Sequence, residues 1–488
     1  MRIVTSRPPA KHAAAKASVP PSAQARFTLA LAGGKAAGTA SRVLRTGGGT
    51  SFPGMVARRI DPRILQKTAA VNNASTVVVT GSNGKTTTCR MLAALARAGG
   101  LSVTQNRSGS NLLQGVISAA VQGTDLRGRM GAQMFLLEVD EATVRLVAPE
   151  VLPGALLITN IFRDQLDRFG ELYTMAKGLE GVIEALPGSA TVALNADDPL
   201  VASLAPDARA RRLYYGIADD GAGAREPEHS ADTIRCVRCQ HMLSYRAVHL
   251  SHLGDYECPE CGNARPGLDV AVTAIRPSKE AGSEITVETP AGIFALQVPL
   301  PGMHNVYNAA AALAGAMALS PSRPLDPAEA RHAIADLRPA FGRLEEIGAG
   351  DRQIVLSFVK NPTSYNATLR EVLQRPGPKH ILAAHSNTVV DGEDFAWLWD
   401  VELERLVPQL ASLTVSGTRA EEVALRFKYA GASPGITTIL PGRSAALSRA
   451  LNATPPGGSL YIFAGYTPMR ELRSVMQRRG WVRPTWEE

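Results

Sequence analysis

The sequence predicts an α/β protein in which helices cover a parallel sheet, and two observations support this fold class. Short β-branched runs alternate with helical patterns, beginning with TVVVT at residues 76–80 and a helical segment at 86–98. Strand patterns at residues 134–139 and 155–160 are each followed by acidic and amide side chains. Ligands in such folds bind at the carboxyl ends of the parallel strands, so we expect a site where these loops meet.

A second α/β unit follows the first. The length of 488 residues predicts two or three domains. The alternation pauses in a polar stretch at residues 216–266 and resumes near Arg343, with strand patterns at 354–358, 380–384, 413–416 and 460–464. We therefore divide the chain into a head at residues 1–25, a lead-in at 26–75, a central domain at 76–340 and a C-terminal α/β domain at 341–488.

The positive charge of the chain is concentrated at its N-terminus. Residues 1–60 contain ten Lys and Arg and no acidic residue, which leaves 42 basic and 44 acidic side chains in the rest. This near-neutral body argues against a nucleic-acid-binding protein. The composition of residues 1–25 predicts a disordered basic head. The chain lacks both an apolar run of the roughly 18 residues that a membrane span needs and the apolar segment of a signal peptide.

The segment GSNGKTT at residues 81–87 has the features of a phosphate-binding loop. It lies between a strand pattern and a helical pattern, so its backbone N–H groups and the helix N-terminus can bind phosphate oxygens. Lys85 offers a positive charge to the β- and γ-phosphates, and the Thr86 hydroxyl is placed to bind Mg²⁺. The general phosphate-loop pattern has a glycine five residues before Gly84, where this chain has Val79.

Four of the five cysteines form two Cys-x-x-Cys pairs. Eighteen residues separate Cys236 and Cys239 from Cys258 and Cys261. Each pair can direct two thiolates at one point, so the spacing predicts a structural zinc ion held by four cysteines in an insertion at about residues 232–266. Unliganded or redox-active cysteines are the alternative. The fifth, Cys89, lies in a helical pattern, where we expect a small core residue.

From about residue 60 to its end, the chain resembles the superfamily of Mur ligases and folylpolyglutamate synthetases. The phosphate loop has the form GxNGKTT, the strand MFLLE ends at Glu138, and TNIFRDQLDRFG at 159–170 is similar to the family's TNxxxDHLDxxG. The segments LYTMAK, NADDP, GMHNVYNAAAA and FGRLE continue the series in the family's order. The resemblance implies a Mur-ligase-like central ATP-binding domain and a Rossmann-like C-terminal domain.

The same resemblance implies roles for individual residues. ATP would be bound by Gly81, Asn83, Gly84, Lys85, Thr86, Thr87, Asn195, Asp198, His304 and Asn305. Thr86 and Glu138 would bind Mg²⁺, and Arg343 would lie near the γ-phosphate. Lys177 stands where many relatives have a carbamylated lysine, with a plain surface lysine as the alternative. Gln165 replaces a histidine that serves the metal in peptidoglycan ligases. Such ligases phosphorylate a carboxylate, and an amine then attacks the acyl phosphate.

Several segments resemble one branch of the superfamily, the MurT family. The lead-in is too short for a full nucleotide-sugar domain and contains GGGTSFPG at 47–54. Residues 357–369 have Lys360 and Asn361 where amino-acid-adding ligases have DYAHNP, which implies that these two residues serve the substrate and that the nucleophile is not an amino acid. DGEDFAWLWD at 391–400 is similar to the MurT segment DGxDxSWxxD, although Ala396 replaces the serine.

MurT ligases work with a glutamine amidotransferase, GatD, whose Cys and His need an acidic third member. The resemblance implies that Asp391, or else Asp394, is that acid. Without the resemblance, a solvated Asp-Gly turn or a helix cap would be the preferred explanation of Asp391. The implied reaction is ATP-dependent amidation of the α-carboxylate of D-glutamate in the lipid II stem peptide, in the cytoplasm at the inner face of the membrane. The implied cofactors are ATP, Mg²⁺ and structural zinc, in a heterodimer with a GatD-like subunit.

Two other functions compete with this hypothesis. The first is an amino-acid-adding ligase of the MurE or folylpolyglutamate type, against which the short lead-in, the cysteine pairs and the missing DYAHNP segment count. The second is a zinc-ribbon regulator or nucleic-acid-binding module with a degenerate ATPase. The intact Lys85, Thr86 and Glu138 argue against it.

Overall fold

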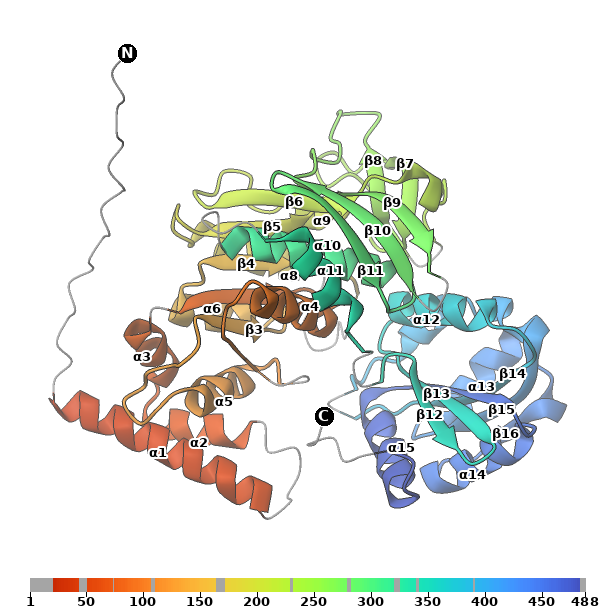
Figure 1. Cartoon of the computed structure of the whole chain (residues 1–488). Coiled ribbons are helices and arrows are strands. Elements are labelled where there is room, and N and C mark those ends of the chain that lie inside the picture. The colour runs from red at the N-terminus through yellow and green to blue at the C-terminus, as the bar shows by residue number, and fades with distance from the viewer. Residues whose placement is uncertain are drawn as a thin grey trace.

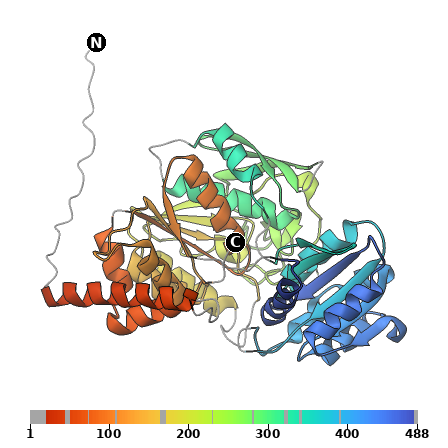
Figure 2. The ribbon, with the colours of Figure 1, turned by 60° about the horizontal axis from the view of Figure 1, so that its bottom comes forward.

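The computed structural model describes residues 21–43, 51–72, 74–106, 110–163, 172–228, 231–278, 282–319, 325–338, 342–388 and 391–482. A nine-stranded sheet organises the central part of these residues, and a six-stranded sheet organises the C-terminal part. The C-terminal unit and the N-terminal helices lie at opposite ends of the molecule, with the larger sheet between them (Figures 1 and 2).

Three helices precede the first strand: α1 (Pro21–Val43), α2 (Phe52–Ile60) and α3 (Ile64–Val71). Residues 21–25, which we assigned to a disordered head, instead begin α1, while residues 1–20 lie outside the described residues. The basic composition hid an apolar face on which Phe27 and Leu31 lie one turn apart and pack into the core beside α2 and α5. Within the described ranges, no helix is both long and apolar enough to cross a membrane.

The larger sheet has the predicted parallel core. Its order is β11-β10-β9-β6-β5-β4-β1-β3-β2; β1 to β6 and β9 pair in parallel, while β10 pairs antiparallel with β9 and β11. The strands are β1 (Ser75–Thr80), β2 (Val103–Gln105), β3 (Met134–Glu138), β4 (Ala155–Ile158), β5 (Thr191–Asn195), β6 (Arg211–Ile217), β9 (Val270–Pro277), β10 (Ser283–Thr289) and β11 (Gly292–Val298).

Helices cover both faces of this sheet, as its β1 strand illustrates. Val77 and Val79 pack into one core cluster, whereas Val78, which points to the opposite face, packs into the other. The first cluster includes α4 (Lys85–Ala98), α10 (Met303–Leu319) and α11 (Pro327–Ala335). The second includes α5 (Leu113–Gly123), α6 (Val144–Val151), α8 (Leu172–Glu184) and α9 (Pro199–Ala202). Burial on both faces explains why these strands read as continuous apolar runs.

The predicted insertion is a separate antiparallel hairpin between β6 and β9. It consists of β7 (Ser244–Leu250) and β8 (Leu253–Glu257) and follows the short 3₁₀ helix η1 (Asp220–Ala222). Its own small core contains Cys236, Leu243, Tyr256 and Cys258.

The second sheet has the order β12-β13-β17-β14-β15-β16, and only β12 is antiparallel to its neighbour. Its strands are β12 (Glu345–Ala349), β13 (Arg352–Phe358), β14 (Lys379–Ala384), β15 (Leu410–Ser416), β16 (Thr437–Ile439) and β17 (Ser459–Ala464). The helices are α12 (Pro362–Gln374), α13 (Ala420–Tyr429), α14 (Arg443–Ala453) and α15 (Tyr466–Arg478), with the 3₁₀ turns η2 (Ala396–Asp400), η3 (Leu403–Arg405), η4 (Val407–Gln409) and η5 (Pro434–Ile436). All four strand patterns predicted here are present.

A close helix contact in the N-terminal region generates a stability prediction. Gly54 of α2 is buried, and a Cβ atom on it would lie 2.0 Å from the Gln114 carbonyl oxygen and 2.8 Å from the Ser118 nitrogen. Gly54→Ala should therefore lower the free energy of unfolding by about 1–3 kcal/mol, because backbone must move. Urea unfolding would measure this change.

Gly181→Ala is the matched control. Gly181 is exposed in α8 with open space around its Cβ position, so this change should raise the free energy of unfolding by about 0.5–1 kcal/mol through helix propensity. Equal effects of the two substitutions would contradict the proposed packing of α2 on α5.

Candidate functional site

The predicted phosphate loop joins β1 to α4, and two glycines give it its shape. Gly81 and Gly84 have φ angles of 124° and 87°, in the region that favours glycine. A Cβ atom on Gly84 would lie 2.2 Å from the Asn308 side-chain oxygen. Only glycine therefore fits at position 84, immediately before α4.

The carboxyl end of β4 fixes this loop from the side. The backbone N–H of Asn83 donates to Asn160 Oδ1 at 2.8 Å, and Thr159 Oγ1 donates to the Asn83 carbonyl at 2.7 Å. Ser82 Oγ accepts from the Phe162 backbone N–H at 3.0 Å. These contacts give a local role to the start of the segment that resembles TNxxxDHLDxxG, whereas Gln165 lies outside the described residues.

Two buried carboxylates face the start of α4. Lys85 Nζ lies 3.0 Å from Glu141 Oε2, and Thr86 Oγ1 donates to Glu138 Oε1 at 2.8 Å. Burial raises the pKa of Glu138 despite the hydrogen bond from Thr86. Burial also opposes ionisation of Glu141, but the charges of Lys85 and Lys360 outweigh it and lower the pKa of Glu141 to about 2. Sequence reasoning missed Glu141, although its place three residues after Glu138 was a usable signal.

The C-terminal domain contributes three of the predicted residues to the same place. Asn361 caps α12 and donates through Nδ2 to Asn83 Oδ1 at 3.4 Å, so it contacts the phosphate loop directly. Burial raises the pKa of Glu138, and the charges of Arg343 and Lys360 offset part of this rise. The Arg343 guanidinium also lies over a ring of β13, 5.5 Å from the centroid of Phe358. The site therefore forms only where the two domains meet.

A cavity next to the loop is lined by residues of both domains. The central domain lines it with Asn83, Gly84, Thr87, Thr159, Asn160, Phe162, Tyr215, Leu250, Leu253, Leu300, Pro301, His304, Asn305, Tyr307 and Asn308. The C-terminal domain lines it with Gly342, Arg343, Leu344, Ser357, Phe358, Thr363, Ser364, Ala367 and Thr368. Burial and the charge of Arg343 lower the pKa of His304 to about 4, so this imidazole is neutral at neutral pH. Apolar walls with a few fixed polar groups suit a nucleoside.

Asn195 and Asp198 are not brought into this cavity. Both are fully buried, and the described residues that line the cavity include neither. Asn195 Nδ2 donates to the Thr159 carbonyl at 2.9 Å, and Asp198 Oδ2 accepts from the Ile161 N–H at 2.9 Å. Asp198 also caps α9. The two side chains therefore position the end of β4, and their predicted role as nucleoside contacts stays a prediction.

Lys177 is also separate from the cavity. It lies on α8, where its side chain is exposed, and it is absent from the described residues that line the cavity. A carbamylated lysine that binds an active-site metal needs a place beside that metal. The geometry of this chain therefore favours the plain surface lysine.

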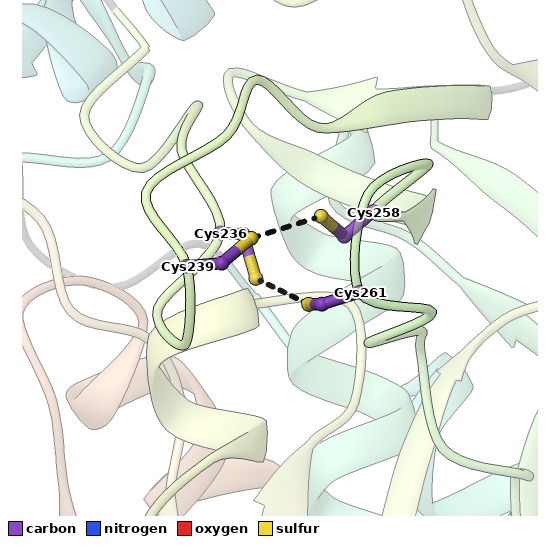
Figure 3. A group of neighbouring side chains, drawn as sticks. All are labelled: Cys236, Cys239, Cys258 and Cys261. Atoms are coloured by element: carbon purple, nitrogen blue, oxygen red, sulfur yellow. Dashed lines mark hydrogen bonds between the residues drawn. The ribbon is translucent and has the colours of Figure 1, made fainter.

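The four insertion cysteines converge on one point, as predicted (Figure 3). All four sulfur atoms lie within 4.8 Å of one another, and the Cys236–Cys261 and Cys239–Cys258 sulfur distances are 3.5 and 3.4 Å. A tetrahedral zinc ion with Zn–S bonds of about 2.3 Å requires sulfur separations of about 3.8 Å. The cluster thus fits zinc and not a set of unrelated thiols.

The two cysteine turns have the same backbone geometry. The Cys236 N–H donates to the His241 carbonyl and the Cys258 N–H to the Asn263 carbonyl, each at 2.8 Å. The residue after each second cysteine has a positive φ, 63° at Gln240 and 68° in the other turn. This shared shape directs each pair of thiolates to the common centre.

Asp391 is held in a defined orientation at the carboxyl edge of the second sheet. Its Oδ1 accepts from the Thr467 backbone N–H at 2.9 Å, at the start of α15, and its Oδ2 accepts from Thr388 Oγ1 at 2.6 Å. The positive end of α15 stabilises the carboxylate. Asp394, in contrast, is exposed, and its Oδ1 accepts from the Ala396 backbone N–H at 2.9 Å.

Comparisons with known proteins agree with this architecture. The model of the Mur ligase middle domain matches residues 79–258, and that of the MurT ligase C-terminal region matches residues 358–469. The chain is 31% identical to the lipid II isoglutaminyl synthase (glutamine-hydrolyzing) subunit MurT of Streptococcus pneumoniae, covering 90% of this chain and 95% of that protein. Its identity to the Staphylococcus aureus COL protein of the same name is 30%, covering 78% and 83%.

Solved structures show the same fold at low identity. A pseudomurein peptide ligase type C from Methanothermus fervidus superposes with a TM-score of 0.63 at 22% identity, covering 83% of this chain and 79% of that one. MurF of Thermotoga maritima in complex with ADP superposes with a TM-score of 0.58 at 15% identity, covering 86% and 85%. The predicted Mur-ligase-like α/β fold is thereby confirmed.

The geometry of the cysteine cluster predicts the metal content of the chain. Cys239→Ala should reduce bound zinc from about one ion per chain toward zero, because a structural site needs all four thiolates. Cys89→Ala, which changes a buried cysteine outside the cluster, should leave zinc unchanged. Metal analysis after dialysis would measure both. Equal zinc in the two variants would contradict a four-cysteine site.

The buried pair of Lys85 and Glu141 predicts a pH-dependent stability. Because the pKa of Glu141 is lowered to about 2, its stabilising effect is present above its ordinary pKa of about 4.5 and is lost as the pH falls toward 2. Glu141→Gln should cost about 3–5 kcal/mol at pH 7, since it leaves Lys85 buried without its partner. The cost should shrink between pH 5 and 3.5.

Urea unfolding of both proteins across this pH range is the measurement. Glu422→Gln, which removes an exposed partner of Arg419, should cost at most about 0.5 kcal/mol at each pH. A cost for Glu141→Gln that does not change with pH would show that the carboxylate charge is not what stabilises the site.

Proposed function

The chain belongs to the MurT family of Mur ligases, and from this premise we propose that it amidates the α-carboxylate of D-glutamate in the lipid II stem peptide. The product is D-isoglutamine, and ATP supplies the energy. The observation that supports this proposal most directly is the meeting of Lys85 and Glu138 with Arg343 and Lys360 across the domain boundary. A cation cluster beside a phosphate loop suits the activation of a carboxylate by phosphoryl transfer.

In the first step, an oxygen of the substrate carboxylate attacks the γ-phosphorus of ATP, and ADP leaves. Lys85 stands at the N-terminus of α4 and is placed to contact the β- and γ-phosphates. Arg343 and Lys360 offset the charge that builds on the transferred phosphoryl group. ADP in a solved MurF of the same fold supports ATP as the nucleotide.

Mg²⁺ fits the residues at the start of α4. Thr86 and Glu138 offer a hydroxyl and a buried carboxylate 2.8 Å apart, which are the hard oxygen donors that this cation prefers. Bound there, Mg²⁺ would neutralise charge on the phosphate oxygens. Glu141 is already paired with Lys85, so it keeps the ammonium oriented toward the loop.

In the second step, ammonia attacks the acyl carbon, phosphate leaves, and the nitrogen loses a proton to give the amide. Lys360 and Asn361 stand at the carboxyl end of β13, where DYAHNP stands in amino-acid-adding ligases. The side chain of Asn361 bonds the phosphate loop and caps α12, so it holds this edge against the nucleotide site. Closure of the cavity by both domains would keep water from the acyl phosphate.

Ammonia would come from a glutaminase subunit similar to GatD. Four of the five cysteines of the chain form the metal cluster, and Cys89 is buried, so a glutaminase nucleophile must come from a partner. Asp391 is a suitable third member for the partner's Cys-His pair, because its half-buried carboxylate is oriented by two hydrogen bonds at the carboxyl edge of the second sheet. The substrate is lipid-linked, so the complex would work at the inner face of the membrane.

Amidation of lipid II with two nitrogen sources tests this proposal. With ATP and Mg²⁺, ammonium should suffice for the chain alone, whereas glutamine should require the glutaminase subunit. Asp391→Asn should lower the glutamine-dependent rate at least about 100-fold, because the histidine loses its orienting carboxylate, and should leave the ammonium-dependent rate unchanged.

Asp351→Asn is the control and should keep both rates. Asp351 lies in the turn between β12 and β13, remote from the edge that holds Asp391. Loss of the glutamine-dependent rate in Asp394→Asn but not in Asp391→Asn would transfer the role to Asp394. ATP turnover driven by an amino acid, without amidated product, would identify an amino-acid-adding ligase instead.

A further inference from the structure

The inserted hairpin extends from the cysteine cluster to the nucleotide cavity. The cysteines stand at its open end, and its tip, residues 250–253, inserts into the central domain. Leu250 and Leu253 line the cavity, while Ser251 and His252 are fully buried. The seven residues of β7 span about 20 Å at 3.3 Å per residue. The metal cluster is thus remote from the nucleotide, but the tip forms part of the nucleotide cavity.

One chain of polar contacts runs from the tip to helix α12 of the C-terminal domain. The Ser251 backbone N–H donates to Glu228 Oε1 at 2.8 Å, and the Glu228 N–H donates to the Ser251 carbonyl at 3.2 Å. The same Oε1 accepts from Arg370 Nη1 at 2.6 Å. The side chains of Glu228 and Arg370 are only 16% and 26% exposed, so each depends on the other as its counter-charge.

A second chain of contacts runs from the tip to the segment that contains Asp391. His252 Nδ1 accepts from the Asp232 backbone N–H at 3.3 Å, and Asp232 Oδ2 accepts from the Arg163 N–H at 2.9 Å. The Arg163 side chain bonds Asp232 and also lies 3.2 Å from Asp400 Oδ2, at the end of η2. Phe162, next to Arg163, lines the cavity, and the centroid of its ring lies 4.8 Å from that of the His252 ring.

Both chains of contacts begin where a nucleotide would pack and end on the C-terminal domain. They form only when the two domains are together, and so does the complete cavity, whose lining includes Ser357, Thr363 and Thr368. A nucleotide that favours this closed arrangement therefore also favours the two chains of contacts. The contacts in turn favour nucleotide binding, as thermodynamic linkage requires.

We propose that the hairpin is the coupling element between nucleotide binding and placement of the C-terminal domain. Glu228 with Arg370, and Asp232 with Arg163 and Asp400, are its positioning residues. A nucleotide packed on Leu250 and Leu253 stabilises the tip, and the two ion-pair chains then hold α12 and the Asp391 segment in their working positions. The inference rests on the proposed function only in taking the ligand to be ATP.

Nucleotide affinity of the full chain tests this inference, with Mg²⁺ and a non-hydrolysable ATP analogue in isothermal titration calorimetry. Arg370→Gln and Asp400→Asn should each raise Kd about three- to fivefold, the size expected for a half-buried ion pair, and the double variant about tenfold or more. Zinc content should stay that of the unmodified chain. Arg405→Gln removes a pair with Glu402 inside the C-terminal domain and should leave Kd unchanged.

A double-mutant cycle separates coupling from a merely additive loss. In the double variant Arg370→Gln with Leu253→Ala, Kd should rise by a smaller factor than the product of the two single-variant factors. A disrupted tip no longer transmits the effect of the ion pair to the nucleotide. Unchanged Kd in Arg370→Gln and Asp400→Asn, or strict multiplicativity in the cycle, would overturn the inference and leave the proposed function standing. Failure of the unmodified chain to bind the analogue would instead overturn the proposed function.

Discussion

The buried ion pair between Lys85 and Glu141 is the interaction around which the candidate site is arranged. Lys85 is only 6% exposed, so its charge must be balanced within the protein. Glu141, in the loop that follows β3, provides that balance, because its Oε2 atom lies 3.0 Å from Lys85 Nζ. Because β1 and β3 are parallel neighbours, their carboxyl ends lie at one edge, and the sheet itself brings the two charges together. Glu138 and Thr86 occupy the same edge, next to the pair.

The central domain provides only part of the site, since Arg343 and Lys360 come from the C-terminal domain. The second sheet also places Asp391 at its carboxyl edge, the position at which the proposed function would bring a glutaminase subunit. The tip of the inserted hairpin is linked to α12 through Glu228 and Arg370, and to Asp400 through Asp232 and Arg163. In the proposed function, such a connection would link the nucleotide site to the surface that receives ammonia from another subunit.

Local patterns predicted the elements that depend on neighbouring residues in the chain, and they failed where a distant contact decides. The strands, the phosphate loop and the four-cysteine cluster were predicted because β-branched apolar runs, glycine turns and paired cysteines are readable in short segments. The start of α1 was missed because Phe27 gains its burial from helices far along the chain. Local patterns also gave no sign that Asn195 and Asp198 hold the end of β4 through hydrogen bonds. Lys177 matched a motif but lies on the exposed face of α8.

The sequence by itself determined the fold class, the chemistry of the phosphate loop and the identity of the metal ligands, because residue type and spacing decide these locally. Only the tertiary structure decided which charges meet. Glu141 pairs with Lys85 across 56 residues, and Arg370 reaches Glu228 across 142. Neither separation leaves a periodic signal, since the pairing follows from strand order and domain packing. A side chain's partner, and therefore its role, depends on that packing and not on its neighbours in sequence.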